Sequence, residues 1–394
     1  MEFERTVVAE LEQAMASKHR LLHVLIGPRQ VGKTTAAVQL VKNLGWPSHS
    51  ATADSAFPLS GDWIETQWRL ARTKAMKGKR FLLVLDEIQK VQGWSEVVKQ
   101  LWDEEVQSGG VVQPLLLGSS ALLVQRGLTE SLAGRFYLHR CTHWSFAECQ
   151  KAFGWDINKW IYFGGYPGAA PIAEDITSWK RYVADSLIET VLARDVLQMQ
   201  NISKPTLLRH LFALAASYPA QIVSYNKMLG TLHDAGNTTT LANYLRILET
   251  AFLVSGLELH SKGQVRSRGS SPKLILWNNA LVNALSLKTF DEAYADGSWW
   301  GRLVENAVGA HLLNNLQGPM WSIQYWRDGT NEADFVVSHG ADTFALEVKS
   351  GGDNKKPDLA AFRKRYPKAK ALLIGDSGIP LSEFLTTPAE EWFR

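Results

Sequence analysis

The chain has 394 residues, of which 45% are hydrophobic and 21% are charged, a composition that excludes a disordered protein. The net charge of +3 is too small to indicate a partner, and two cysteines exclude a disulfide framework. No apolar run approaches the ~20 residues that span a membrane, and the charged start lacks a signal-peptide core. We therefore expect a cytoplasmic protein that does not enter a membrane.

The first 145 residues alternate short apolar strands with helix-like segments, a pattern typical of a parallel α/β sheet. Each candidate strand is apolar on both faces, as expected for a strand that helices cover from two sides. The candidate strands are residues 21–27, 81–86, 112–118 and 135–141.

A glycine-rich loop follows the first of these strands and precedes a helix-like segment. Its sequence, GPRQVGKTT, matches the phosphate-loop pattern G-x-x-x-x-G-K-T. Glycines let backbone N–H groups face phosphate oxygens, and the helix start adds partial positive charge. We expect Lys33 to neutralise the β- and γ-phosphates of ATP and Thr34 to ligate Mg²⁺. The predicted nucleotide contacts are Gly27, Pro28, Arg29, Gln30, Val31, Gly32, Lys33, Thr34 and Thr35.

An acidic pair ends the apolar strand at residues 81–86, where parallel α/β sheets bind their ligands. We predict that Asp86 holds Mg²⁺, usually through water, and that Glu87 polarises the attacking water. The alternative is a capping acid pair.

Two further strand boundaries carry polar residues. Ser119 and Ser120 follow the strand at 112–118 and are expected near the γ-phosphate. Arg135 precedes the next strand and could reach nucleotide phosphates, in its own chain or in a neighbour's. The alternative for Arg135 is an ordinary surface arginine.

A zinc site is the one metal centre that the cysteines suggest. His139, Cys141 and His143 alternate, with Cys149 nearby. Structural zinc sites normally repeat a ligand pair at a distance, and that repeat is missing here. We therefore do not predict zinc.

Residues 146–265 have mainly helical periodicity. Within them, residues 223–249 resemble a helix–turn–helix whose second helix Thr238 or Thr239 could cap. That helix could enter a DNA groove, or it could serve ordinary packing or a protein contact. The Gly/Ser/Arg-rich residues 261–272 are a plausible domain boundary or hairpin tip.

A predicted hairpin near the C-terminus brings two acids and a lysine together. Glu347 and Lys349 are two residues apart and face the same way, and antiparallel pairing lets Asp334 join them. These carboxylates, with Glu305 from a preceding helix, could hold one Mg²⁺ for phosphodiester cleavage. The alternative is a solvated surface pair.

The following residues 349–370 carry eight basic and two acidic side chains, which suits either a phosphate-binding surface or a solvated helix.

With these motifs in place, the chain resembles bacterial and archaeal AAA+-type ATPases that carry an uncharacterised C-terminal domain of the PD-(D/E)xK nuclease-like fold. The motifs that carry the resemblance are GPRQVGKTT, LVLDEIQKVQGWSE, LLLGSSALLVQRG, SLAGRF, FGGYPG, SLIETVLARDV, SSPKLILWNNAL, GRLVENAVGAHLL and the run from YWRDGTNEADFVV to FALEVKSG. The chain departs from the family at Asn278, where such proteins tend to have an aspartate.

The resemblance implies three domains. They are a P-loop ATPase domain (AAA+/ASCE-like, residues 1–145), a helical and winged-helix-like region (146–265) and a restriction-endonuclease-like α/β domain (266–394). It also implies that Arg135 belongs to the nucleotide site, and it matches Asp334, Glu347 and Lys349 to the nuclease metal-site pattern.

The function we predict is ATP hydrolysis coupled to DNA binding and metal-dependent DNA cleavage. The alternative is a nucleotide-dependent switch whose inactive nuclease-like domain binds DNA or a protein partner. A homo-oligomer is consistent with either reading, because Arg135 could act across subunits.

Overall fold

The structure is a computed structural model that describes residues 3–17, 19–76, 79–118, 128, 131–197, 202–232, 236–261, 270–351 and 359–394. The chain forms two compact units, Met1–Thr142 and His143–Arg394. The first unit ends close to the boundary at residue 145 that the sequence indicated. The expected boundary at 265–266 lies between two strands of the second unit that pair with each other.

A five-stranded parallel sheet forms the core of the first unit, in the order β2-β3-β4-β1-β5. Its strands are β1 (Leu22–Ile26), β2 (Ser48–Thr52), β3 (Phe81–Asp86), β4 (Val112–Gly118) and β5 (Phe136–Arg140). Strands β1 and β4 are buried along their whole length because helices lie on both sides. Strand β4 separates β1 from β3, so the phosphate loop and the acidic pair follow strands that are not neighbours.

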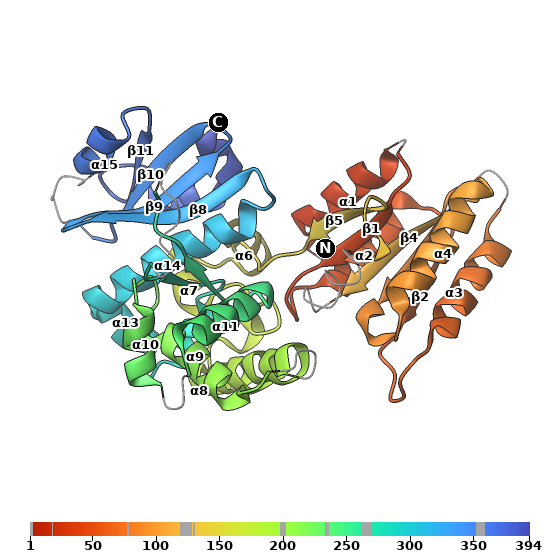
Figure 1. Ribbon diagram of the computed structural model, residues 1–394, viewed down its shortest axis with the longest axis horizontal. Helices are drawn as coiled ribbons and strands as arrows, with labels where there is room; N and C mark the ends of the chain where they lie inside the picture. The colour runs from red at the N-terminus through yellow and green to blue at the C-terminus, as the bar shows by residue number, and fades with distance from the viewer. Residues whose placement is uncertain are drawn as a thin grey trace. The chain divides into compact units, whose positions relative to one another are not determined.

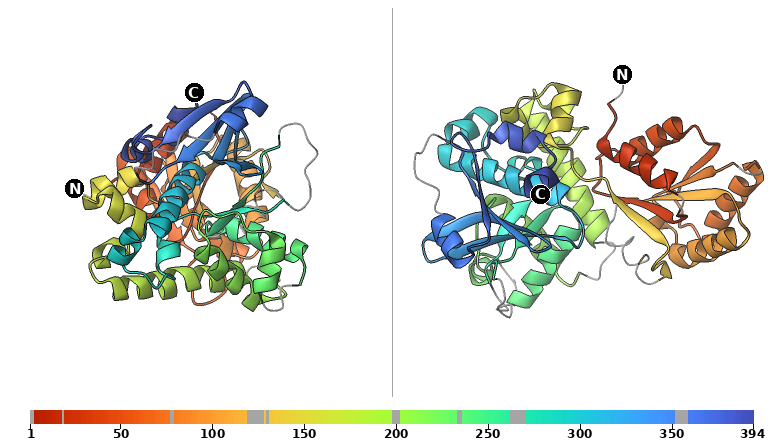
Figure 2. Two further views of the ribbon diagram at one scale, coloured as in Figure 1. Left: turned by 90° about the vertical axis from the view of Figure 1, so that its left-hand side faces the viewer. Right: turned by 90° about the horizontal axis from the view of Figure 1, so that it is seen from above.

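Helices cover both faces of this sheet (Figures 1 and 2). Right-handed crossovers place the helix after β1 on one face and those after β2 and β3 on the other. These helices are α1 (Thr6–Ala16), α2 (Lys33–Leu44), α3 (Gly61–Lys74) and α4 (Trp94–Gln107), with a 3₁₀ turn at Ile88–Lys90.

The second unit begins with helices that pack around a cluster of aromatic side chains. The cluster includes Tyr162, Phe163 and Trp179, whose ring centroids lie 4.9–5.9 Å apart. The elements are α6 (Phe146–Phe153), α7 (Ile157–Phe163), a 3₁₀ turn (Ala170–Ile172), α8 (Ile176–Arg181) and two π-helical segments (Tyr182–Ile188 and Val191–Leu197).

Three helices and an antiparallel strand pair follow, in the order expected of a winged helix. They are α9 (Pro205–Ser217), α10 (Tyr225–Thr231), α11 (Thr238–Thr250), β6 (Val254–Leu257) and β7 (Lys273–Leu276). The expected cap of α11 shifts by one residue, because the side chain of Asn237 accepts the Thr240 amide at 2.9 Å. Thr238 and Thr239 lie inside the helix.

The last part of the chain is a four-stranded sheet in the order β11-β10-β9-β8. Helix α14 packs on one face, where Gly309 approaches Phe335, and α15 packs on the other, against Val336 and Ala345 (Figure 1). The elements are α12 (Ala280–Asn283), α13 (Phe290–Ala295), α14 (Gly297–Asn315), β8 (Trp321–Asp328), β9 (Asn331–His339), β10 (Asp342–Val348), α15 (Leu359–Arg365), β11 (Lys370–Ile374), α16 (Leu381–Thr386) and a 3₁₀ turn (Ala389–Phe393).

Candidate functional site

The phosphate loop spans the gap between the end of β1 and the start of α2, as its sequence predicted. Gly32 has a φ of 92° and Gln30 a φ of 62°, so the loop turns through the left-handed region before the helix begins. At Gly27, an added Cβ would lie 1.9 Å from the carbonyl oxygen of Cys141, just beyond β5. Glycine is therefore required at position 27 by close backbone contact.

Lys33 is buried beneath this loop, with 7% of its surface exposed. Its ammonium donates hydrogen bonds to the carbonyl oxygens of Gly27, at 3.0 Å, and Pro28, at 2.7 Å. The loop thus wraps around a positive charge, which is the arrangement that a nucleotide phosphate requires.

The hydroxyl of Thr34 and the carboxylate of Asp86 contact each other at the carboxyl edge of the sheet. Thr34 Oγ1 donates to Asp86 Oδ2 at 2.7 Å, although β4 separates the two parent strands. The other oxygen, Oδ1, accepts the Glu87 amide at 2.8 Å. A hydroxyl and a carboxylate oxygen held together are ligands that suit Mg²⁺, so these residues fit the expected ion.

Glu87 has a left-handed backbone, with a φ of 54°, which is uncommon for a residue other than glycine. Its Oε2 accepts a hydrogen bond from Gln89 Nε2 at 2.7 Å. This turn places Glu87 directly after β3, at the carboxyl edge of the sheet where the phosphate loop also lies.

The side chain of Arg5 holds the phosphate loop through hydrogen bonds, a role that no sequence motif indicated. One guanidinium nitrogen, Nη1, donates to the carbonyl oxygen of Val31 at 3.1 Å and to that of Thr142 at 2.9 Å. It also lies 3.2 Å from the sulfur of Cys141. The side chain is 7% exposed, so it is a buried cation shared by the loop and the last residue of the unit.

The structure does not bring Arg135 to the phosphate loop of its own chain. Arg135 precedes β5, which runs parallel to β1, and its carbonyl accepts the amide of Leu22 at the start of β1. It therefore lies at the amino edge of the sheet, about 15 Å of strand away from the loop. Its guanidinium holds both oxygens of Asp103, at 2.8 and 3.2 Å, which lowers the pKa of that carboxyl.

Ser119 and Ser120, the expected γ-phosphate contacts, lie outside the described residues. The histidines and cysteines do not form a joint site in the part of the chain that the structure describes. His139 Nε2 lies 3.0 Å from His23 Nδ1, Cys141 contacts Arg5, and His143 belongs to the second unit.

In the C-terminal sheet, the hairpin brings the predicted acids together. The β9–β10 register pairs Leu346 with Phe335, and its continuation places Glu347 opposite Asp334. Lys349 Nζ lies 2.7 Å from Glu347 Oε1, and Asp334 Oδ2 accepts the Val348 amide at 2.7 Å. Glu347 is 7% exposed, and its Oε2 has no hydrogen-bond partner among the described residues.

A fourth charged residue, Lys273 at the start of β7, lies where the sequence predicted none. Its ammonium is 2.5 Å from Glu305 Oε1, 3.4 Å from Glu332 Oε1 and 3.6 Å from Asp334 Oδ1. The carboxylate of Glu305, expected to bind a metal, is thus paired with a lysine. Only the apolar run that follows Lys273 hinted that its side chain would be buried.

Burial and the neighbouring charges shift the pKa values of Lys273 and Glu305 in opposite directions. Burial lowers the pKa of Lys273, but Glu305, Asp334 and Glu332 outweigh it, so the net pKa is raised and the ammonium persists. Burial raises the pKa of Glu305 to about 7, because it outweighs the attraction of Lys273.

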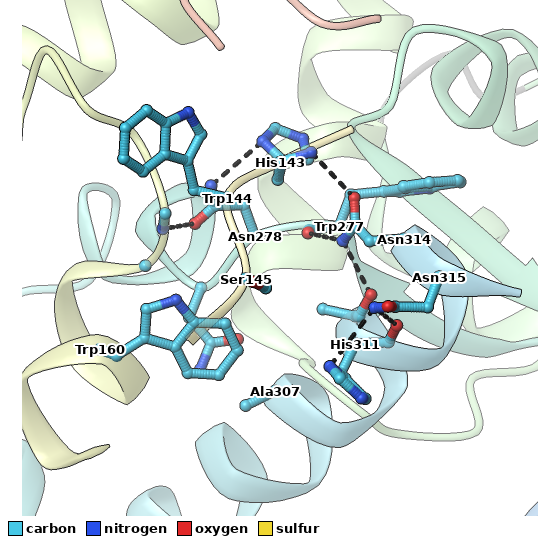
Figure 3. Close-up of a pocket in the computed structure, with 14 residues that line it drawn as sticks. His143, Trp144, Ser145, Trp160, Trp277, Asn278, Ala307, His311, Asn314 and Asn315 are labelled. Atoms are coloured by element: carbon cyan, nitrogen blue, oxygen red, sulfur yellow. Dashed lines mark hydrogen bonds between the residues drawn. The ribbon is translucent and has the colours of Figure 1, made fainter. Parts of the chain in front are cut away.

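Asn278, the departure from the family pattern, has a structural position. Its Oδ1 accepts the amides of Gly165, at 3.1 Å, and Ala280, at 3.0 Å, and its Nδ2 lies 3.1 Å from His143 Nδ1. Figure 3 shows these side chains lining a small pocket with His311 and Asn314. In this chain the residue therefore joins three segments of the second unit.

The basic run after Lys349 is described only in part. Lys355 and Lys356 lie outside the described residues. Arg363, Lys364 and Arg365 occupy the last turn of α15, and Arg365 lies 3.6 Å from Asp328. No helix in the described ranges is long and apolar enough to cross a membrane.

Comparisons with protein families divide the chain into three segments. Residues 19–150 match the AAA domain family, residues 154–292 match a domain of unknown function (DUF8612), and residues 300–388 match another (DUF4143). An uncharacterized protein of Haemophilus influenzae is 21% identical over 354 residues, which cover 83% of this chain and 82% of that protein.

Among solved structures, the RuvB Holliday junction branch migration motor of Thermotoga maritima is 14% identical, with a TM-score of 0.35, over 69% of this chain and 92% of that one. The Aeropyrum pernix ORC1 protein in complex with DNA is 14% identical, with a TM-score of 0.28, over 74% and 94%. Similarities this low carry no conclusion about function. The family match over residues 19–150, the five-stranded parallel sheet and the glycine loop together support an AAA-type P-loop fold for the N-terminal unit.

Proposed function

We propose that the N-terminal unit binds ATP with Mg²⁺ and hydrolyses it. The observation that carries this proposal is the 2.7 Å contact between Thr34 and Asp86, directly beyond a glycine loop wrapped around Lys33. When bound, Mg²⁺ neutralises phosphate charge and fixes the β- and γ-phosphates. Thr34 and Asp86 would hold it.

The residues of the chain supply the remaining chemistry. The loop amides and the start of α2 bind the phosphate oxygens, and Lys33 exchanges its carbonyl partners for them. Glu87 orients a water molecule for attack on the γ-phosphorus and accepts its proton.

Two substitutions test this proposal. Lys33→Met should weaken ATP binding by about 10- to 100-fold, since a charged hydrogen bond is worth ~1.5–3 kcal/mol. Glu87→Gln should retain binding but lose turnover. Lys42→Met, at an exposed lysine of the same helix, is the matched control. If Lys33→Met binds labelled ATP as wild type does, the proposal fails.

A second candidate function is metal-dependent cleavage of DNA by the C-terminal part. The order helix–three strands–helix–strand, from α14 to β11, supports it. So does Glu347, which lies opposite Asp334 and whose buried Oε2 has no hydrogen-bond partner among the described residues. These two carboxylates would hold an ion that polarises a phosphodiester, and Lys349 would orient the attacking water. The described residues contain no group of three or more His, Cys, Asp or Glu side chains arranged to hold a metal ion.

The winged-helix order of α9 to β7 and the basic turn of α15 support DNA as the partner. Plasmid incubated with protein, ATP and Mg²⁺ or Mn²⁺ should be cut, and a Lys349→Ala protein should not cut it. If neither protein cuts but DNA accelerates ATP turnover, the C-terminal part acts as a nucleotide-dependent binding switch. If DNA changes nothing, a protein partner takes its place.

The position of Arg135 bears on assembly. Because it lies at the amino edge of the sheet, any contact with a γ-phosphate would be to the nucleotide of a neighbouring copy. We propose that such a contact forms in a homo-oligomer. Light scattering with ATP and Mg²⁺, on wild type and Arg135→Ala, tests it, and an ATP-independent monomer would refute it.

A further inference from the structure

Lys273 is a fully buried lysine surrounded by oxygen atoms from two separate elements. Its relative exposure is 0%, and its nearest oxygens are Glu305 Oε1 from α14 and the backbone oxygen of Asp334 from β9, at 2.5 and 3.0 Å. The carboxylates of Glu332 and Asp334 complete the shell at 3.4 and 3.6 Å. The ammonium also lies 5.1 Å from the centre of the Phe335 ring.

This environment is built for a cation. A buried ammonium is strongly destabilising unless carboxylates and hydrogen-bond acceptors surround it. Three carboxylates that lie this close together and are only partly exposed also repel one another unless a positive charge lies among them. The oxygen shell resembles the one that proteins offer to hard divalent ions, but its centre is occupied by a nitrogen of the chain itself.

We propose that the Lys273 ammonium is the resident cation of this carboxylate cluster, and that Glu305, Glu332 and Asp334 accept a divalent ion only when the charge of Lys273 is removed. The cluster then assembles without metal, and Glu305 is a counter-ion of the lysine rather than a metal ligand. This inference stands whether or not the domain cleaves DNA. Any ion that serves cleavage has to bind on the Glu347 side of Asp334.

The position of Lys273 gives the cluster a second consequence. Lys273 begins β7, which pairs with β6 in the strand pair of the winged-helix-like region, while its partners belong to α14 and β9. The lysine therefore fastens that strand pair to the C-terminal sheet through charge. Loss of the charge should loosen both elements together.

The test is the divalent-ion response of the full-length, nucleotide-free protein. Lys273→Met keeps the length of the side chain but removes the charge, and should lower the unfolding midpoint by about 10 °C. Millimolar Mn²⁺ should restore at least half of that loss, because the ion replaces the ammonium. The double variant Lys273→Met, Glu305→Gln should not recover. Lys288→Met, at a half-exposed lysine beside Asp296, is the control and should neither lose stability nor respond to Mn²⁺ more than wild type does.

The inference is overturned if Mn²⁺ stabilises wild type and Lys273→Met equally, or if Lys273→Met unfolds no earlier than wild type. Should Lys273→Met fail to fold, Glu305→Gln alone decides. Titration calorimetry should then give the same Mn²⁺ affinity for wild type and Glu305→Gln. A loss of tenfold or more would show that Glu305 is a metal ligand and would reject the proposal.

Discussion

Substitution of Gly27 by alanine should disable the nucleotide site through backbone geometry alone. The new Cβ would lie 1.9 Å from the carbonyl oxygen of Cys141 and 2.9 Å from its carbon, whereas real Cβ contacts stay above 3.0 Å. Both partners are backbone, so no side chain can rotate away. The ends of β1 and β5 must separate by at least about 1 Å.

The magnitude follows from what that separation breaks. The Cys141 amide donates to the carbonyl oxygen of Ile26 at 2.8 Å, and this bond is worth about 1 kcal/mol. Forced overpacking in a dense interior adds about 1–3 kcal/mol. A total of about 2–4 kcal/mol should lower the unfolding midpoint of the N-terminal unit by about 10 °C. Since Gly27 also begins the phosphate loop, ATP affinity should fall at least tenfold.

Thermal unfolding and fluorescent-nucleotide titration together check this reasoning. The matched control is Gly45→Ala at the other end of α2, where φ is 60° but nothing lies within 4 Å of the new Cβ. That variant should lose about 1 kcal/mol from backbone strain and bind ATP normally. If Gly27→Ala binds ATP as tightly as Gly45→Ala, the close contact at Cys141 does not shape the site.

Two further predictions concern the same unit. Burial lowers the pKa of His23 to about 4 and that of His139 to about 3, from an ordinary 6.5. Above pH 6.5 these histidines are neutral in both the folded and the unfolded protein and cost no stability. Below pH 6.5 the unfolded protein binds protons first, so the free energy of unfolding falls as the pH approaches 4, by up to about 2 kcal/mol per histidine at pH 5. Urea midpoints at pH 7 and pH 5 should differ more for wild type than for His139→Asn, and equal differences would contradict this. Arg5→Lys should weaken ATP binding about 3- to 10-fold, because the lysine ammonium ends one bond short of the Nη1 position that bonds Val31 and Thr142. An unchanged titration would show that Arg5 does not support the loop.

The sequence predicted the buried strands closely and failed where a strand was polar. The candidates at 81–86 and 112–118 coincide with β3 and β4, because a strand covered on both faces must be apolar throughout. Strand β2, Ser48–Thr52, gives no such signal. It is an edge strand that pairs only with β3, so it is half exposed and tolerates the sequence SHSAT.

The residues of the candidate sites divide in the same way. Some are placed by the local sequence, and others only by contacts between segments far apart in the chain. Lys33, Thr34 and Asp86 could be predicted because a loop and a strand end fix their positions locally. Lys273 could not, because its partners lie 32 to 61 residues away and depend on how α14 and β9 pack. Arg135 shows that the direction of a strand matters. A residue that precedes a parallel strand lies at the edge of the sheet opposite to the ligand, and the sequence spacing of Arg135 alone did not reveal this.

The side chain of Arg5 connects the phosphate loop to the end of the N-terminal unit. The Arg5 guanidinium donates to Val31 within the loop and to Thr142, the last residue of that unit. The next residue, His143, is fixed within the second unit by the side chains of Asn278 and Asn314. A loop that closes on a phosphate must therefore either carry Thr142 with it or break a charged hydrogen bond worth about 1.5–3 kcal/mol.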